Sequence, residues 1–475
     1  MKHRLTALAL ALVMVLSLGC GSAFAADETA ELTPMPAWSA DVVADAYAMG
    51  LFGDEIYTVH SDTVTPEQLD VMVQVVSDKL ALLGVETRPA SDEALVIDST
   101  RGGVVNAFYQ AAAAYAFEGI DQAPEDYMVS LGVLRGDGTG LHLERECTTM
   151  EAAALAERLI LALYDQQNAG SLGLLWEASN GEGSTLYLLG SIHTDRNNVY
   201  PFHKQLRDII TNAEQVTFEL DFNDAGQIAE FAAMQTYTDG TTLAAHISPE
   251  LYQVVVDTAV SMGLSEDYIA QFKPWALASS FQSLALLDDE TTGANAMAID
   301  LYVNSKAVNA GIPIDAVETY AFQGGIFDTL SDEYQEAYLE SGLLMCLDVD
   351  NMDESTREAL TAVLGEEALE PATQEALDAE VALIGEWMDQ WKARDCDGFA
   401  LSYDKEAIIN SGDELNSRLF TDRDPGMIQY AADYLSQDGQ HTGLMVVGAG
   451  HMIGDTGIVQ GLIDLGYDVH VVPVP

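Results

Sequence analysis

Two copies of a Gly-x-x-His motif carry the side chains best suited to chemistry. The first motif ends at His193 and the second at His451, and each directly follows a short apolar segment, residues 186–189 and 444–447. A single loop histidine is usually exposed or merely hydrogen-bonded, so the repetition carries the prediction. In an open α/β sheet, sites form at the carboxyl ends of the strands, where glycine allows close approach of the backbone. We therefore expect both imidazoles at this edge, as ligands of one metal ion or as an acid and a base.

A carboxylate follows a third apolar segment. In Phe218-Glu219-Leu220-Asp221, strand alternation places Glu219 and Asp221 on one face. Two imidazoles and a carboxylate leave open positions on a divalent ion, where bound water loses its proton more readily and a scissile carbonyl is polarised. These mixed ligands suit Mn, Co or Zn. Acidic residues after strands are also common at surfaces, and Asp221 with Asp224 is more typical of solvated surface or of a helix start.

The segments that must position these residues predict an α/β fold. Beyond a boundary at residues 169–173, strand-like apolar segments alternate with helical periodicity, which favours a mainly parallel sheet. Helical patterns from about residue 224 to 310, and again from 332 to 409, predict a long helical insert. The predicted strands cover residues 186–189, 216–220, 312–317, 444–447 and 468–472.

Residues 172–475 resemble the TraB/GumN family, which includes PrgY-like proteins and relatives of the Tiki metalloproteases. Several short motifs follow one another in register over the whole segment, which makes the resemblance far more specific than any single motif. Besides the two Gly-x-x-His motifs, they are Leu175-Trp176-Glu177, Tyr200-Pro201, Phe218-Glu219-Leu220, Lys273-Pro274-Trp275, Ile299-Asp300, Val317-Glu318-Thr319 with Gln323, and Arg423-Asp424 with Met427.

The resemblance implies a fold shared with erythromycin-esterase-like and ChaN-like proteins. For the Tiki branch it also implies a peptidase that depends on a divalent metal, Mn or Co. Carried over to this sequence, the candidate metal ligands or catalytic acid–base groups are His193, His451 and Glu219. The apolar positions near Trp275, and Met427, are most simply explained as core.

The same resemblance assigns Glu318, Arg423 and Asp424 to substrate binding. It implies that Glu318 and Arg423 line one cleft, where a guanidinium could hold a substrate carboxylate or stabilise an oxyanion. Arg423 could equally cap a helix or bridge surface acids, and Glu318 could only cap a turn. The family usually has Arg-Asn where this chain has Arg423-Asp424. The added negative charge could strengthen cation binding or weaken the site.

Residues 1–25 have the pattern of a secretory signal peptide. Two basic residues precede an apolar stretch over residues 5–18, and small residues follow it. Ala23-Phe24-Ala25 offers a cleavage site, whereas Cys20 offers a lipidation site. We therefore expect an extracellular or cell-surface protein, secreted or lipid-anchored, with no transmembrane span after signal removal.

Residues 38–167 predict a small helical domain, which an acidic tether at residues 26–37 joins to the signal. Two units with a helix, a Gly-hydrophobic turn and a threonine before a second helix are similar to S-layer homology repeats. The family's Thr-Arg-Ala-Glu start appears as Thr65-Pro66-Glu67-Gln68 and as Thr149-Met150-Glu151-Ala152, so its arginine is missing from both. Cell-wall association, a helical spacer and a partner-docking module all stay open, because a threonine N-cap explains the pattern without a ligand.

Composition excludes some classes of partner. A net charge of −57 opposes binding to nucleic acid and to anionic membranes. Apart from Cys20, the sequence contains Cys147, Cys346 and Cys396. Their number and spacing argue against a disulfide framework or a zinc knuckle, and a single disulfide between two of them is an open alternative. The sequence has no HExxH, GxSxG or Walker motif.

The sequence as a whole predicts an exported, metal-dependent hydrolase that acts on a peptide or another small substrate. The alternative is a non-catalytic protein of the same fold that binds or sequesters a peptide or a signalling molecule.

Overall fold

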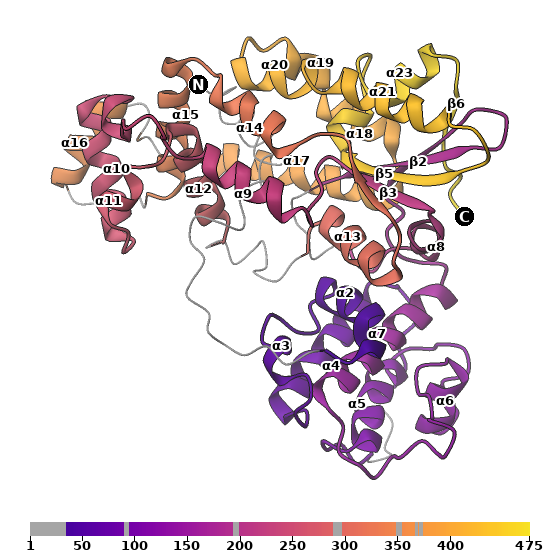
Figure 1. The fold of residues 1–475 in the computed structure, drawn as a ribbon. Coiled ribbons are helices and arrows are strands. Elements are labelled where there is room, and N and C mark those ends of the chain that lie inside the picture. Colours follow the sequence, from indigo (N-terminus) through magenta and orange to yellow (C-terminus); the bar gives the residue numbers. More distant parts are fainter. Residues whose placement is uncertain are drawn as a thin grey trace.

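The computed structural model describes residues 35–89, 95–192, 199–287, 297–347, 354–365, 369 and 374–475 (Figure 1). The predicted signal peptide at residues 1–25, the predicted tether up to residue 34, and His193 lie outside these residues. Among the helices that the structure describes, none combines the length and apolar character that a bilayer crossing requires.

The N-terminal third of the described chain is helical. Thr65 and Gln68 form a capping box at the start of one of its helices, so the threonine there acts as an N-cap. In the second unit the threonine that the repeat resemblance selects, Thr149, is the first helical residue, and the N-cap is the preceding residue, Thr148, which forms a capping box with Glu151. The elements are η1 (Ala37–Ser39), α2 (Ala40–Ala48), α3 (Ile56–Val59), α4 (Pro66–Ala81), α5 (Arg101–Ala113), α6 (Pro124–Ser130) and α7 (Thr149–Gln166).

A six-stranded mixed sheet follows, in the order β4-β3-β5-β2-β1-β6. Its neighbours from β4 to β2 are parallel, whereas β1 runs antiparallel to both β2 and β6. The α/β prediction is therefore confirmed, with a sheet that is mixed because β1 opposes its neighbours. The strands are β1 (Leu174–Ser179), β2 (Thr185–Ser191), β3 (Gln215–Phe218), β4 (Ile314–Ala316), β5 (Thr442–Gly448) and β6 (Asp468–Val471).

Helices fill the long stretches of chain between the strands. α21 and α23 cover one face of the sheet, and α8 and α13 cover the other (Figure 1). Much of the insert has its own apolar core, in which Trp275 and Phe327 stack with ring centroids 5.7 Å apart. The helices are α8 (Lys204–Asn212), α9 (Ala225–Met234), η3 (Leu243–Ala245), α10 (Pro249–Ser261), α11 (Glu266–Ile269), α12 (Pro274–Leu287), α13 (Ile299–Ala310), α14 (Tyr320–Asp328), α15 (Asp332–Met345), α16 (Glu354–Leu364), α17 (Gln374–Ala393), α18 (Cys396–Tyr403), α19 (Lys405–Ile409), α20 (Glu414–Thr421), α21 (Asp424–Leu435), α22 (Ala449–Met452) and α23 (Ile458–Asp464).

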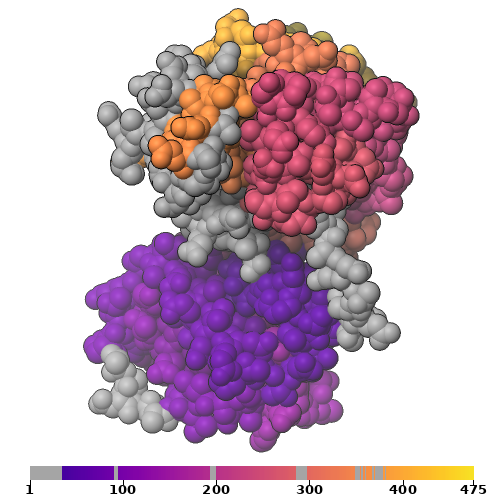
Figure 2. Space-filling view, turned by 90° about the vertical axis from the view of Figure 1, so that its left-hand side faces the viewer, coloured from indigo at the N-terminus to yellow at the C-terminus, as the bar shows by residue number. Residues whose placement is uncertain are grey.

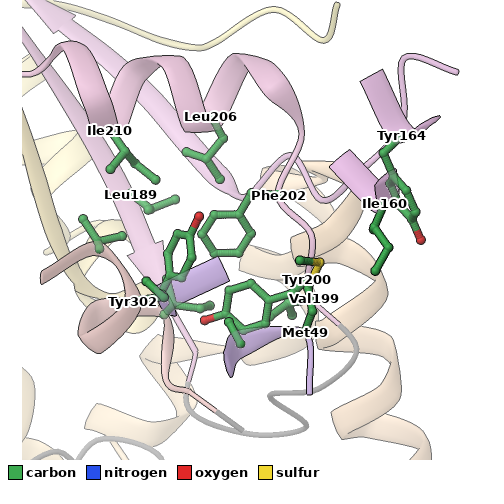
Figure 3. Packing of buried hydrophobic residues seen from close by; sticks show 14 of the residues in the cluster. Met49, Ile160, Tyr164, Leu189, Val199, Tyr200, Phe202, Leu206, Ile210 and Tyr302 are labelled. Atoms are coloured by element: carbon green, nitrogen blue, oxygen red, sulfur yellow. The ribbon is translucent and has the colours of Figure 1, made fainter. Parts of the chain in front are cut away.

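The helical region packs against the α/β region through one shared core. Figure 2 shows the two as adjoining lobes, the helical one in indigo and purple. Met49 and Ile160 of the helical lobe belong to the same buried cluster as Phe202 and Tyr302 of the other (Figure 3). The amine of Lys79 donates a hydrogen bond to the carbonyl of Tyr200 at 2.8 Å across this junction. The three described cysteines are free thiols.

Candidate functional site

The carboxyl ends of three parallel strands lie side by side (Figure 1). β5 is the central strand of the three, with β3 on one side and β2 on the other. Gly190 pairs with Val447 and Ser191 with Gly448, so the two Gly-x-x-His motifs leave the sheet at neighbouring positions. Phe218 pairs with Val446, which brings Glu219 to the same edge. The predicted approach of His193 to this edge stays a prediction, because that residue lies outside the described part of the chain.

The glycines of the two motifs are needed for close packing of the protein itself. A Cβ atom at Gly190 would lie 3.0 Å from the Cα and Cβ atoms of Ala449, so glycine lets α22 lie directly against β2. A Cβ atom at Gly450 would lie 2.8 Å from the hydroxyl of Tyr403. Both glycines therefore admit neighbouring segments of the chain.

His451 lies in α22 and is completely buried. Its Nδ1 atom is 2.7 Å from Oδ1 of Asp424. Its Nε2 atom is 3.9 Å from Oε1 of Glu219 and has no hydrogen-bond partner among the described residues. A buried polar nitrogen without a partner is uncommon in folded proteins. One ring nitrogen is therefore fixed by the protein, and the other faces a carboxylate.

Arg423 joins the two glutamates of the site. It donates from Nε to Glu318 at 3.0 Å, and from one terminal nitrogen to Glu318 at 2.8 Å and to Glu219 at 2.5 Å. The backbone amide of Gly448 donates to Glu219 Oε1 at 2.8 Å, and the side-chain amide of Gln323 donates to Glu318 at 2.7 Å. The surface-bridge explanation for Arg423 is wrong, because its side chain is only 3 % exposed and bridges two buried or nearly buried acids. Arg423 stands at the N-cap position of α21, but its side chain makes no capping hydrogen bond there.

This network sets the charge of Glu219. Burial by itself would raise the pKa of Glu219, but the nearby charge of Arg423 and the hydrogen bonds from Gly448 and Arg423 outweigh it and lower the pKa to about 2. Burial likewise opposes the charge on Arg423, yet Glu219 and Glu318 together raise the pKa of its guanidinium well above the usual value. Glu219 is thus a carboxylate at neutral pH, suited to binding a cation and poorly suited to donating a proton.

Lys405 is a site residue that the sequence analysis did not select. It is completely buried, and its Nζ atom lies 2.7 Å from Oδ2 of Asp424 and donates to the carbonyl of Ile453 at 3.0 Å. Burial lowers the pKa of Lys405, although Asp424 opposes this. In the sequence, Lys405 stands between Asp404 and Glu406, a pattern typical of exposed charge, so no local signal marks it.

Several other candidates follow their simpler interpretations. Asp221 accepts hydrogen bonds from the backbone and side chain of Asn223, as a surface turn residue would. Met427 and Trp275 are buried in the apolar cores. His203 accepts a hydrogen bond from the backbone amide of Gln205 and so caps α8.

The described residues include two candidate ligands for a metal ion, His451 and Glu219. Among them, no group of three or more His, Cys, Asp and Glu side chains is arranged to hold a metal ion. The Nε2 atom of His451 and the Glu219 carboxylate beside it fit a divalent ion in donor type, and Nε2 has no other partner among the described residues. Any third protein ligand must therefore come from outside the described residues, where His193 lies.

The fold and the site define an α/β protein with a buried, charged cluster at the carboxyl edge of its sheet. The model of the TraB/PrgY/gumN family matches residues 174–471, from the first residue of β1 to the last of β6. The chain belongs to this family. Comparison with curated proteins and with solved structures gave no significant match. Neither the S-layer-like repeats nor the ChaN-like fold gains support from these comparisons.

Proposed function

We propose that this protein is a divalent-metal-dependent hydrolase, most simply a peptidase, with His193, His451 and Glu219 as its metal ligands. The observation that carries the proposal is the buried Nε2 atom of His451, which faces Glu219 and has no partner among the described residues. A divalent ion would satisfy Nε2 of His451 and would have the Glu219 carboxylate as a second ligand. The repetition of strand, glycine and histidine supplies the argument for His193.

Each described residue of the site has a part in this proposal. A bound Mn, Co or Zn ion would supply a more acidic water molecule and a Lewis acid for a carbonyl. Gly448 and Arg423 hold the Glu219 carboxylate in place through its two oxygens. Glu318 neutralises Arg423 and so keeps the guanidinium next to Glu219. Nε and one terminal nitrogen of Arg423 already donate to Glu318 and Glu219, so we assign Arg423 first to orienting Glu219. These nitrogens could bind a substrate carboxylate or an oxyanion only if the substrate replaced one of the two glutamates.

We also propose export, on the signal-like pattern of residues 1–25, with Cys20 as the lipidation site if the protein is anchored. Its substrates would then be peptides or other small molecules outside the cytoplasm. Association of residues 38–167 with the cell wall is a further proposal, which binding of the purified protein to isolated wall material tests.

Metal content and peptide cleavage test the enzymatic proposal. We expect the purified protein to bind about one Mn, Co or Zn ion per site and to cleave members of a peptide library. His193→Ala and His451→Ala should each abolish stoichiometric metal and lower kcat/KM by more than about 100-fold, since even residues behind metal ligands matter by 10–100-fold. His441→Ala is the matched control, because His441 immediately precedes the opposite end of β5 and bonds the carbonyl of Asp438. Full metal content in both variants would contradict the ligand assignment.

A non-catalytic binding protein is the second candidate. The observation that favours it is the ion pair between Glu219 and Arg423, which satisfies the carboxylate without a metal ion. In that case a peptide would bind saturably, with an affinity that a chelator does not change, and no cleavage product would appear with Mn, Co or Zn.

A further inference from the structure

Three buried side chains, those of Lys405, Asp424 and His451, contact one another in a row. The row ends at Nε2 of His451, which has no hydrogen-bond partner among the described residues. Lys405 and His451 have no exposed side-chain surface, and that of Asp424 is 2 % exposed. Oδ2 of Asp424 lies 2.7 Å from Nζ of Lys405, and Oδ1 lies 2.7 Å from Nδ1 of His451. Thr456 adds a longer hydrogen bond of 3.4 Å to Oδ2. Both carboxylate oxygens are therefore occupied by groups of this chain.

The pairing with Lys405 accounts for an aspartate at this position. A carboxylate taken out of water is costly unless it is paired and hydrogen-bonded. Lys405 comes from the start of α19, and Asp424 is the first residue of α21, so two separate helices bring the charges together. The charge of Asp424 is thereby balanced within the protein, and the residue contributes neither a free ligand nor an unpaired charge to the site.

The same contacts select one form of the His451 ring. A carboxylate only accepts hydrogen bonds, so the contact with Asp424 places a ring proton on Nδ1, and in the neutral ring the lone pair is then on Nε2. Phe420 packs beside the ring with centroids 5.4 Å apart, and Nζ of Lys405 lies 4.8 Å from the centroid of Phe420. Asp424 thus holds the His451 ring at Nδ1, and Phe420 packs against one side of the ring.

We propose that Lys405 is a positioning residue that acts through Asp424 to hold His451 as the Nδ1-protonated tautomer, with Nε2 directed at Glu219. The benefit to metal binding rests on the proposed function. The tautomer and the charge pairing do not, because both are properties of the metal-free protein.

A double-variant cycle tests the charge pairing. We compare the melting temperatures of the full mature chain, of Lys405→Met, of Asp424→Asn and of the variant with both changes. Each single change should lower Tm by roughly 5 °C, since it leaves a buried charge without its partner. The double variant should regain most of the loss, because methionine beside asparagine is neutral. If the two losses simply add, the pairing does not hold the site together, and the proposal is overturned.

Nitrogen NMR of histidine-labelled, metal-free protein tests the positioning role. The His451 signals are assigned by their disappearance in His451→Ala. We expect a protonated Nδ1 and an unprotonated Nε2 in the wild type, and departure from this pattern in Lys405→Met and in the double variant, where an asparagine amide can donate as well as accept. Lys392→Met is the matched control, since Lys392 pairs with Asp389 at the surface; it should change nothing.

Two results would overturn the proposal: a proton on Nε2 in the wild type, or an unchanged His451 pattern in Lys405→Met. If Lys405→Met does not fold, the tautomer in the wild type and in the double variant still decides. Absence of metal binding or cleavage in the wild type would contradict the hydrolase proposal. The Tm and NMR results on metal-free protein would stay valid, so failure of the hydrolase proposal and failure of the Lys405 proposal are distinguishable.

Discussion

Arg423 forms ion pairs with two carboxylates at once, and this arrangement makes the candidate site sensitive to acid. The folded-state pKa of Glu219 is about 2, because the charge of Arg423 overcomes the effect of burial, whereas an unpaired glutamate titrates near 4.5. A carboxyl group with a lowered pKa contributes stability that is present above the unfolded pKa and is lost as the pH falls toward the folded pKa.

We therefore predict that Glu219→Gln flattens the acid limb of the stability profile. Above pH 5 the variant should lose about 3 kcal/mol of unfolding free energy, and the loss should shrink between about pH 4.5 and 2. Urea unfolding at several pH values measures this. Asp221→Asn, two residues away and in a surface turn, should change stability by less than about 0.5 kcal/mol. A constant difference at every pH would contradict the assignment of the charge to Glu219.

At the scale of single residues, motifs in the sequence identify the groups that meet but not those that support them. Glu219, Glu318, Arg423 and His451 lie together because each follows a motif placed at a strand end or a helix start. The sequence does not mark Lys405 because its burial depends on how α19 lies against Phe420 of α20 and Asp424 of α21, which charge patterning along the sequence does not report. His193 remains a sequence-based prediction.

Among the elements, α22 is the one whose placement matters most to the site. It is a single helical turn directly after β5, and it carries His451 against β2. Gly190 makes this approach available because β2 has no side chain where Ala449 packs.

Gly190→Ala should consequently displace α22 and damage the site. The added methyl group would meet the backbone of Ala449, which cannot swing away as a long side chain can. We expect the unfolding free energy to fall by about 1–3 kcal/mol. The proposed metal binding should weaken by more than this loss of stability alone would cause. Gly385→Ala in α17 is the control: a Cβ atom there meets nothing within 4 Å, so the change should be neutral or stabilising. Wild-type metal affinity in Gly190→Ala would refute the steric argument.

The elements were predictable to the extent that hydrophobic pattern decides them. The sequence predicts β2, β3 and β5 as apolar segments, and their boundaries in the structure differ by one or two residues. β1 was missed as a strand, although Leu175-Trp176-Glu177 was noticed as a motif. It pairs antiparallel with β2 across a turn in which Asn180 accepts from the amides of Glu182 and Ser184, so its place depends on a hairpin rather than on alternation with helices.

For the whole molecule, the junction between the helical and the α/β lobes contains a second buried charge cluster. Asp45 of α2 accepts hydrogen bonds at 2.6 Å from both Tyr302 and Lys306 of α13. Glu157 of α7 is buried, and its Oε2 atom has no hydrogen-bond partner among the described residues. Because α13 also packs against β3 and β4, this cluster links the helical lobe to the sheet.

Glu157 should make the junction weaker as the pH rises. Burial, and then the negative charge of Asp45, raise the pKa of Glu157 to about 8, despite the opposing charges of Arg158, Lys306 and Arg207. The folded protein therefore holds a proton that the unfolded chain loses near pH 4.5, so stability falls between about pH 4.5 and 8. Glu157→Gln removes this titration. At pH 8 it should raise the unfolding free energy by about 3–5 kcal/mol and therefore raise Tm, while Tm near pH 4.5 should stay almost unchanged. Glu125→Gln, on the exposed side of α6, should alter neither value. A Tm gain that is equal at both pH values would mean that packing, rather than the buried charge, limits this junction.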